Sequence, residues 1–391
     1  MPFQPWDNPM GTDGFEFVEY AAPDPKAMGA LFGQMGFSAI ARHRHKDVTL
    51  YRQGEINFII NAEPDSFAQR FARQHGQSVC AIAIRVDDAA FAYRRALELG
   101  AWGFDNKNGP MELNIPAIKG VGDSLLYFVD RWRGKHAHGG APAGSIGDIS
   151  IYDVDFIALP GADAGAAAVN PAGCGLTYID HLTHNVHRGR MKEWAEFYQN
   201  LFNFREVRYF NIEGKFTGLK SKAMTSPCGK IRIPINESSD DKSQIAEYLD
   251  QYHGEGIQHI ALGTDNIYQA IQQMRDAGIA FRDTIETYYE LIARRLPHHG
   301  ENLDELRRLR ILVDGHSNAT ERELLLQIFT QNVIGPIFFE IIQRKGDQGF
   351  GEGNFRALFE SIELDQIQRG VLQDLSPAPA PAPVTEPTET R

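Results

Sequence analysis

The two halves of the sequence repeat one pattern of segments, and this repeat restricts the possible folds more than any other feature. The strand-like segment 15–20 (FEFVEY) is followed by a helical run, and 178–186 (YIDHLTHNV) opens the second half in the same way. Segments 79–88 and 257–266 each precede a helix, and these helices end in ALELGA and MRDAGI. Self-similarity over so long a period indicates duplicated domains rather than a solenoid.

The ends of the two halves also correspond. Segment 125–131 (LLYFVDR) matches 338–344 (FFEIIQR), and strands expected at 111–116 (MELNIP) and 324–329 (LLLQIF) lie at equal distances upstream of them. Each half therefore alternates short strands with helices in the order of paired β-α-β-β-β modules. We expect an α+β fold in which each half forms a strongly curved mixed sheet with a cavity on its concave side.

The chain of 391 residues has the length of two to three average domains. We expect an N-terminal domain at 8–155, a linker rich in small residues at 156–175 and a C-terminal domain at 176–373. Residues 374–391 alternate Pro and Ala and then become polar, a composition typical of an extended, disordered tail.

Composition excludes several classes of protein. With 39 basic and 51 acidic residues, the chain has a formal charge of −12, which argues against a broad nucleic-acid-binding face. Its apolar runs are far shorter than the ~20 residues that a membrane helix needs. Three cysteines without a CxxC pair indicate neither a disulfide scaffold nor a thiolate zinc site. With no basic leader before an apolar run, we expect a cytoplasmic protein without membrane or nucleic-acid partners.

Ionisable residues interrupt three strands of the second half only. They are His181, His259 and Glu340. The matching positions of the first half hold Phe17, Ala81 and Tyr127. A polar side chain within an apolar strand costs free energy unless it has a partner, so three such positions in one copy predict one shared partner.

Two imidazoles and one carboxylate form the facial triad that holds ferrous iron and leaves positions open for substrate and dioxygen. Zinc also accepts two His and one Glu, and the residue types alone do not exclude it. The HExxH helix of zinc proteases is absent from the sequence, and the three residues are on separate strands. Redox chemistry at iron is therefore the favoured interpretation.

Two other motifs favour ordinary structural roles. His184 and His187 complete an HxxHxxH pattern with His181, but alternation along a strand turns His184 to the opposite face, so we interpret both as polar-face or loop residues. Segment 349–354 (GFGEGN) lacks the GxGxxG spacing and the lysine of a phosphate loop. We interpret it as a hinge into a last helix at about 354–372.

Alternation along the strands also predicts which side chains line the cavity. Phe338 lies on the same face as Glu340, and Gln327 and Phe329 share one face of the preceding strand. Asn236 and Ser221 lie opposite their apolar or basic neighbours. An aromatic pocket with a few polar groups suits an aromatic substrate that carries a polar substituent.

These segments resemble the 4-hydroxyphenylpyruvate dioxygenase family in its bacterial form. The likeness is carried by IDHLTHNV, PINE, GIQHIAL, LLLQIFT and, above all, FFEIIQRKGDQGFGEGNFRALFESIE, and it extends from about Asn8 to Leu372. The resemblance implies tandem vicinal-oxygen-chelate modules of the glyoxalase and bleomycin-resistance type. It also implies one Fe(II) per chain, in the C-terminal domain, held by His181, His259 and Glu340.

The resemblance further implies a set of substrate contacts. The polar ones are Ser221, Asn236, Gln244 and Gln327. The aromatic ones are Phe329, Phe338, Phe350, Phe355 and Phe359, the last two from the C-terminal helix. Gln258 also matches a position discussed in the family, but alternation places it opposite His259, so we do not include it.

The implied reaction converts 4-hydroxyphenylpyruvate and dioxygen to homogentisate and carbon dioxide, a step of tyrosine and phenylalanine breakdown. No 2-oxoglutarate is expected, because the substrate is itself the 2-oxo acid. The resemblance also implies a homo-oligomer, a tetramer rather than a dimer. Two alternatives remain open: a 4-hydroxymandelate synthase acting on the same substrate, and a metal-free ligand-binding protein of the same fold.

Overall fold

The computed structural model describes most of the chain. It covers residues 3–105, 108–109, 111–135, 149–160, 170–213, 218–318, 320–354, 366 and 369–371. The expected tail at 374–391 and the predicted contacts Phe355 and Phe359 lie outside these residues. No helix within them is both long enough and apolar enough to cross a membrane.

The first half forms one sheet with the strand order β6-β7-β8-β5-β1-β4-β3-β2-β9. Its strands are β1 (Phe15–Ala21), β2 (Ser38–His43), β3 (Val48–Gln53), β4 (Ile56–Asn61), β5 (Ser78–Arg85), β6 (Gly103–Phe104), β7 (Ala117–Lys119), β8 (Leu125–Val129) and β9 (Phe156–Ala158). Its helices are α1 (Pro25–Gln34), α2 (Phe67–His75), α3 (Ala89–Glu98) and α4 (Ile151–Asp155). Strand β9, at the start of the expected linker, pairs with β2 at the edge of the sheet.

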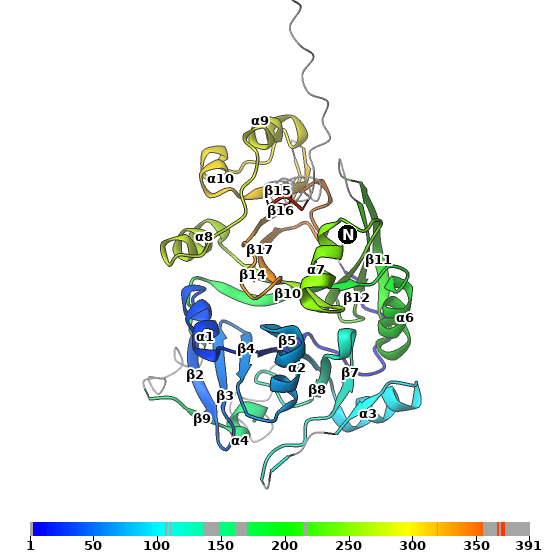
Figure 1. Cartoon of the computed structure of the whole chain (residues 1–391). Helices are drawn as coiled ribbons and strands as arrows, with labels where there is room; N and C mark the ends of the chain where they lie inside the picture. The colour runs from blue at the N-terminus through cyan, green and yellow to red at the C-terminus, as the bar shows by residue number, and fades with distance from the viewer. Residues whose placement is uncertain are drawn as a thin grey trace, which may run out of the picture.

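The second half forms a second sheet with the order β11-β12-β13-β10-β14-β17-β16-β15. Its strands are β10 (Leu176–Val186), β11 (Arg205–Glu213), β12 (Gly218–Thr225), β13 (Arg232–Ser238), β14 (Gly256–Thr264), β15 (Leu312–Ser317), β16 (Arg322–Phe329) and β17 (Phe338–Lys345). Its helices are α6 (Met191–Phe202), α7 (Gln244–Tyr252), α8 (Ile267–Asp276), α9 (Glu286–Arg295) and α10 (Leu303–Leu309). Figure 1 shows the two sheets one above the other, with helices outside them.

The duplication predicted from the sequence is confirmed. Each half contains two β-α-β-β-β modules, which meet where β1 pairs antiparallel with β5 and where β10 pairs with β14. Helices α9 and α10 are additional elements of the last module. The helices α3 and α8 begin at equivalent places, where the side chains of Asp88 and Asn266 accept hydrogen bonds from backbone N–H groups of the first turn.

The strand registers also confirm the pairing of positions between the halves. In the second sheet His181 lies opposite Ala261, which lies opposite Glu340. In the first sheet the same rows contain Phe17, Ala83 and Tyr127. In the adjacent rows Thr183 lies opposite His259, whereas Glu19 lies opposite Ala81. The metal-ligand types are therefore replaced in the first half at the positions expected.

The strand predicted at 111–116 is wrong. The strand of the first half that corresponds to β16 is β7, which begins at Ala117 and pairs Ala117 with Tyr127. Met111 has a φ of 67°, a left-handed conformation that does not fit a strand. Pro116 has no N–H to donate to a ladder. The segment therefore forms no strand in spite of its alternating pattern, although the carbonyl of Pro116 accepts a hydrogen bond from the backbone N–H of Phe128 on β8.

Bulges interrupt the central strand pairs at matching places in both halves. Ile179 of β10 pairs with Leu262 of β14, and His181 pairs with the adjacent Ala261. Asp180 is therefore the extra residue on β10. Glu16 is the extra residue at the same place on β1. On β14 the extra residue is Gln258, next to His259. A bulge breaks the alternation of side chains and so allows two neighbouring residues to lie on one face.

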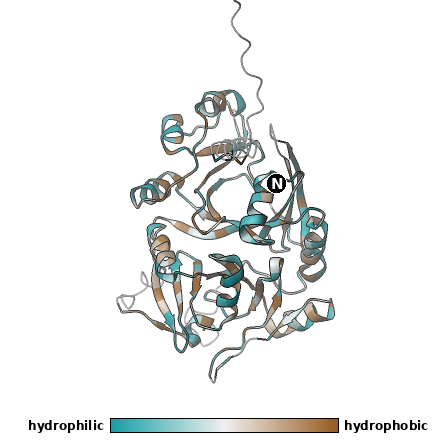
Figure 2. Ribbon diagram, in the orientation of Figure 1, coloured by the Kyte–Doolittle hydropathy of each residue, from teal (hydrophilic) through white to brown (hydrophobic). Residues whose placement is uncertain are grey.

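One large hydrophobic core joins the two halves. It contains residues from both sheets and from the inner faces of helices in both halves, including Phe58, Phe339, Phe32, Tyr198 and Ile271. The rings of Phe58 and Phe339 lie 5.9 Å apart and connect β4 to β17. Figure 2 shows apolar residues along the strands and a mixture of apolar and polar residues on the helices. The two duplicated units are thus packed on each other rather than tethered by the linker alone.

Candidate metal centre

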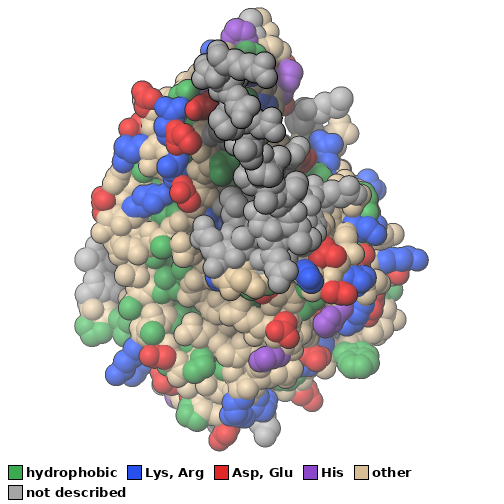
Figure 3. Space-filling view, turned by 45° about the horizontal axis from the view of Figure 1, so that its top comes forward, with side chains coloured by type: hydrophobic (Ala, Val, Ile, Leu, Met, Phe, Trp, Pro, Cys, Tyr) green, Lys and Arg blue, Asp and Glu red, His purple; other side chains and the backbone are tan. Residues whose placement is uncertain are grey.

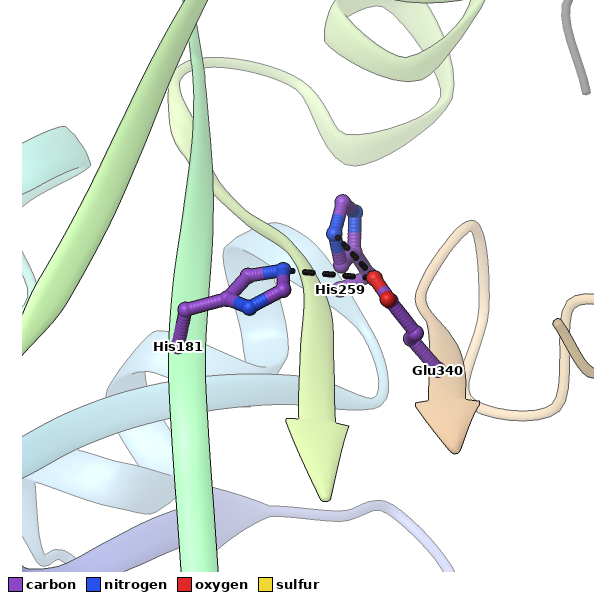
Figure 4. A group of neighbouring side chains, drawn as sticks. All are labelled: His181, His259 and Glu340. Carbon is purple, nitrogen blue, oxygen red and sulfur yellow. Dashed lines mark ion pairs between the residues drawn. The ribbon is translucent and has the colours of Figure 1, made fainter. Parts of the chain in front are cut away.

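His181, His259 and Glu340 converge on the concave side of the second sheet. Figure 4 shows them projecting from three neighbouring strands, β10, β14 and β17, toward one point. Nε2 of His181 lies 3.2 Å from Oε2 of Glu340, and Nε2 of His259 lies 3.5 Å from the same oxygen. One ligand atom from each of the three lies within 4.8 Å of the others, and all three residues are largely enclosed.

The charges at this point are strongly coupled. Burial alone would lower the pKa of His181, but the Glu340 carboxylate and the neighbouring Asp180 outweigh it and raise that pKa. Burial lowers the pKa of His259 despite the attraction of Glu340. Burial alone would raise the pKa of Glu340, but the two histidines hold it below its usual value. A carboxylate and two imidazoles thus share one enclosed site.

The donor set fits a divalent cation. Oε1 of Glu340 is buried and has no hydrogen-bond partner among the described residues, which is costly for a carboxylate oxygen unless a cation balances it. Two imidazole nitrogens and a carboxylate are the ligands of the iron facial triad. In the part of the chain that the structure describes, no other three His, Cys, Asp or Glu residues meet in this way.

The residues that precede the two histidines orient their rings. Oδ1 of Asp180 lies 2.9 Å from Nδ1 of His181, and Oε1 of Gln258 lies 3.1 Å from Nδ1 of His259. With Nδ1 engaged in this way, each ring turns Nε2 toward the shared point. Thr183 adds a contact on that side, with Oγ1 2.9 Å from Nε2 of His259.

A cavity opens beside the three residues. Besides the three candidate ligands, it is lined by four phenylalanines, five polar side chains and two aliphatic ones, namely Phe210, Phe329, Phe338, Phe350, Thr183, Ser221, Asn236, Gln244, Gln258, Leu219 and Pro234. Phe338 stacks on His259 at 4.9 Å, and Phe350 meets His181 edge-on at 5.7 Å. Aromatic walls with a few polar groups are typical of a pocket for a small organic ligand, and two of these rings pack against the histidines.

Six of the predicted substrate contacts line this cavity. They are Ser221, Asn236, Gln244, Phe329, Phe338 and Phe350. Gln327 is buried and is not one of the lining residues. A Cβ on Gly351 would stand 1.9 Å from its Oε1, and this oxygen has no hydrogen-bond partner among the described residues. Any side chain at position 351 would clash with Gln327, and the φ of 75° at this position also favours glycine.

The exclusion of Gln258 from the cavity is wrong. Strict alternation placed it opposite His259, but the bulge on β14 turns both residues to the concave face. The sequence pattern also did not predict Thr183, Phe210, Leu219 and Pro234 as lining residues. Thr183 and Pro234 could have been found, because they lie two residues from His181 and Asn236 on the same strands.

His184 faces away from the cavity, as predicted, but it is not on a polar face. It is fully buried in the core, with Nε2 2.7 Å from the hydroxyl of Tyr198 on α6. Burial lowers its pKa to about 3. His187 lies in the exposed loop after β10, where its backbone N–H donates to Glu255.

This buried histidine predicts sensitivity to acid. In the unfolded chain its pKa is ~6.5, so below that pH the unfolded state takes up a proton that the folded state refuses until about pH 3. Stability should therefore fall as pH drops through this window, by at most about 1.4 kcal/mol per pH unit from this residue. Between pH 7.5 and pH 5.5, the melting temperature of His184→Gln should fall by less than that of the unchanged chain. Equal shifts would contradict the assignment.

The corresponding space of the first half is filled. The rings of Phe17 and Tyr127 lie 5.7 Å apart, where the second half holds His181 and Glu340. Buried aliphatic side chains and Tyr152 pack around Phe17 in a separate small core. Outside the cavity, acidic and basic side chains are intermingled on the face of the molecule drawn in Figure 3.

Comparison with known proteins gives the family. Residues 6–157 match the model described as hydroxyphenylpyruvate dioxygenase, N-terminal, and residues 178–291 match the glyoxalase/bleomycin resistance protein/dioxygenase superfamily. The chain is 57% identical to hemolysin VllY of Vibrio vulnificus, over 94% of this chain and 98% of that protein. It is 55% identical to 4-hydroxyphenylpyruvate dioxygenase of Pseudomonas aeruginosa, over 93% and 97%.

Two solved structures share the fold. A triple mutant of 4-hydroxymandelate synthase from Streptomyces coelicolor has a TM-score of 0.75 and 25% identity, with 91% of this chain and all of that chain covered. A fusion of a xylose isomerase-like TIM barrel with 4-hydroxyphenylpyruvate dioxygenase has a TM-score of 0.73 and 32% identity, covering 92% of this chain and 54% of the fusion. A 4-hydroxyphenylpyruvate dioxygenase of Legionella pneumophila is 48% identical, over 95% of this chain and 99% of that protein. The chain therefore belongs to the 4-hydroxyphenylpyruvate dioxygenase family.

Proposed function

We propose that this enzyme converts 4-hydroxyphenylpyruvate and dioxygen to homogentisate and carbon dioxide. The observation that carries the proposal is the enclosed His181, His259 and Glu340 group beside an aromatic cavity. The relatives of 48–55% identity that carry the name of this dioxygenase support it.

His181, His259 and Glu340 would hold one Fe(II) per chain, in the second half. When bound, ferrous iron supplies the activation of dioxygen and the Lewis acidity that decarboxylation and ring hydroxylation require. The chain's own residues supply position and enclosure. None of the described residues that line the cavity is Lys or Arg, so the charge that balances the substrate's carboxylate would come from the cation rather than from a basic side chain.

The cavity walls would hold the aromatic ring of the substrate. Phe338 and Phe350 stand against the two histidines, and their rings would confine the substrate's ring near the ligand site and exclude water. Ser221, Asn236, Gln244 and Gln258 offer the polar groups that would bind the phenol hydroxyl and the oxo acid. Phe355 and Phe359, which lie beyond the described residues, remain proposed contacts, as does the buried Gln327.

A product assay tests this function. Protein stripped of metal by a chelator and reloaded with Fe(II) should consume dioxygen in the presence of 4-hydroxyphenylpyruvate and release homogentisate, whereas reloading with Zn(II) should give no turnover. 4-Hydroxymandelate as the main product would replace the dioxygenase by the synthase whose fold the chain shares. Binding of the substrate without turnover at saturating Fe(II) would favour a ligand-binding protein.

Three further expectations are also proposals. The domain limits 8–155 and 176–373 with a tail at 374–391, a cytoplasmic location and a homotetrameric assembly follow from the sequence and from the family resemblance. Light scattering on the purified chain would measure the assembly directly.

A further inference from the structure

The bulge that precedes His181 contains a buried ion-pair network that the proposed reaction does not use directly. The side chain of Asp180 is fully enclosed, and Nε and Nη2 of Arg344 donate to its two oxygens at 2.7 and 2.8 Å. Arg232 approaches the same carboxylate at 3.3 Å. The hydroxyl of Tyr178 donates to the same carboxylate at 3.4 Å, and Nδ1 of His181 lies 2.9 Å from it.

The position of Arg344 connects this network to the cavity wall. Arg344 follows Glu340 by four residues on β17, so both side chains lie on the concave face. Its guanidinium also donates to the backbone carbonyls of Asp347 and Gly349, at 3.1 and 2.7 Å. These carbonyls belong to the loop that carries Phe350 to the edge of His181. Arg344 therefore holds both the Asp180 carboxylate, which contacts Nδ1 of His181, and the loop that carries Phe350.

The first half provides a natural comparison. Glu16 occupies the matching bulge of β1, is buried, and pairs with Arg85 at 2.5 Å. The residue that follows it is Phe17, not a histidine. An acid paired with an arginine thus occurs at this bulge in both halves, but only in the second half does the acid touch an imidazole.

We infer that Asp180, held by Arg344, is a positioning residue for metal binding. This inference rests on the proposed metal centre. Its carboxylate keeps the proton of the His181 ring on Nδ1 and directs the free electron pair of Nε2 to the metal, and its charge makes that nitrogen a stronger donor. Gln258 does the same for His259 through a neutral amide. The two histidines therefore differ in donor strength, and His181 is the stronger ligand. Loss of such an outer partner weakens metal binding by about 10- to 100-fold.

Two matched variants separate this role from a purely structural one. Asp180→Asn and Glu16→Gln each remove one buried charge, at the same bulge of the two halves, without a change of shape. Equilibrium binding of Mn(II), measured as free metal by electron paramagnetic resonance, should show a rise in Kd of about 10- to 100-fold for Asp180→Asn. Glu16→Gln should leave the Kd unchanged, although both variants lower the melting temperature.

An unchanged Mn(II) Kd in folded Asp180→Asn would overturn the inference, and so would an equal rise in Glu16→Gln. If the unchanged chain binds no Mn(II), the proposed metal centre fails, and the inference with it. Should Asp180→Asn not fold, the unchanged chain still gives a test. With Zn(II) bound and ¹⁵N-labelled histidine, nuclear magnetic resonance should place the His181 proton on Nδ1, and a proton on Nε2 would overturn the inference.

Discussion

Replacement of Glu340 by Ala is expected to abolish turnover and to weaken Fe(II) binding by more than about 100-fold, the upper range for loss of an outer partner of a metal ligand. Glu340 is the only carboxylate among the three described residues whose ligand atoms meet. Without it none of the three ligand groups carries a negative charge, and the charge of a divalent cation is less well balanced in an enclosed site. Anaerobic Fe(II) titration and oxygen consumption measure the two effects.

Tyr127→Ala is the matched control for this variant. Tyr127 occupies the same row of the first sheet as Glu340 does in the second. The first half has Phe17 and Ala81 at the positions where metal ligands would be needed. Removal of the Tyr127 side chain should therefore leave one Fe(II) bound per chain. Equal loss of iron in both variants would contradict the assignment of the metal to the second half alone.

Replacement of Phe58 by Ala is expected to lower the free energy of unfolding by about 3–5 kcal/mol, the usual cost of a large core truncation. Phe58 is fully buried and touches four aromatic rings, those of Tyr20, Phe32, Phe37 and Phe339. Since Phe339 precedes Glu340, we expect the metal site to be lost in the same transition as the first half. Denaturation followed by circular dichroism and by metal release measures both.

The control for Phe58 is another phenylalanine of the first half. Phe91 on α3 is 43% exposed, so Phe91→Ala should change stability by no more than about 0.5 kcal/mol. In Phe58→Ala, the first half could unfold at a lower denaturant concentration while the metal is still released at the concentration seen for the unchanged chain. That result would show that the two halves do not share one cooperative core.

Much of the fold and of the site was predictable because the two duplicated halves of the chain can be compared with each other. A ligand type at His181, His259 or Glu340 stands out only against Phe17, Ala81 or Tyr127, and alternation along regular strands then places Ser221, Asn236 and Phe338 on the concave face. These predictions require no more than the period of a strand and the cost of a buried polar group.

The errors have a common physical origin. Bulges are not visible in the hydrophobic pattern, so strict alternation predicts the wrong face for Gln258 and gives no role to Asp180. His184 gained its partner, Tyr198, from a helix, which a pattern confined to one strand cannot reveal. At 111–116 an alternating pattern was overruled by the backbone of Met111. Each error arose where an interaction between separate elements, or a local departure from regular geometry, decided the outcome.

Anomalous diffraction at the iron absorption edge, from crystals of the Fe(II)-loaded protein, tests the central claim most directly. One peak per chain is expected, in contact with His181, His259 and Glu340, with no peak beside Phe17, Ala81 and Tyr127. A peak in the first half, or iron bound away from these three residues, would contradict it.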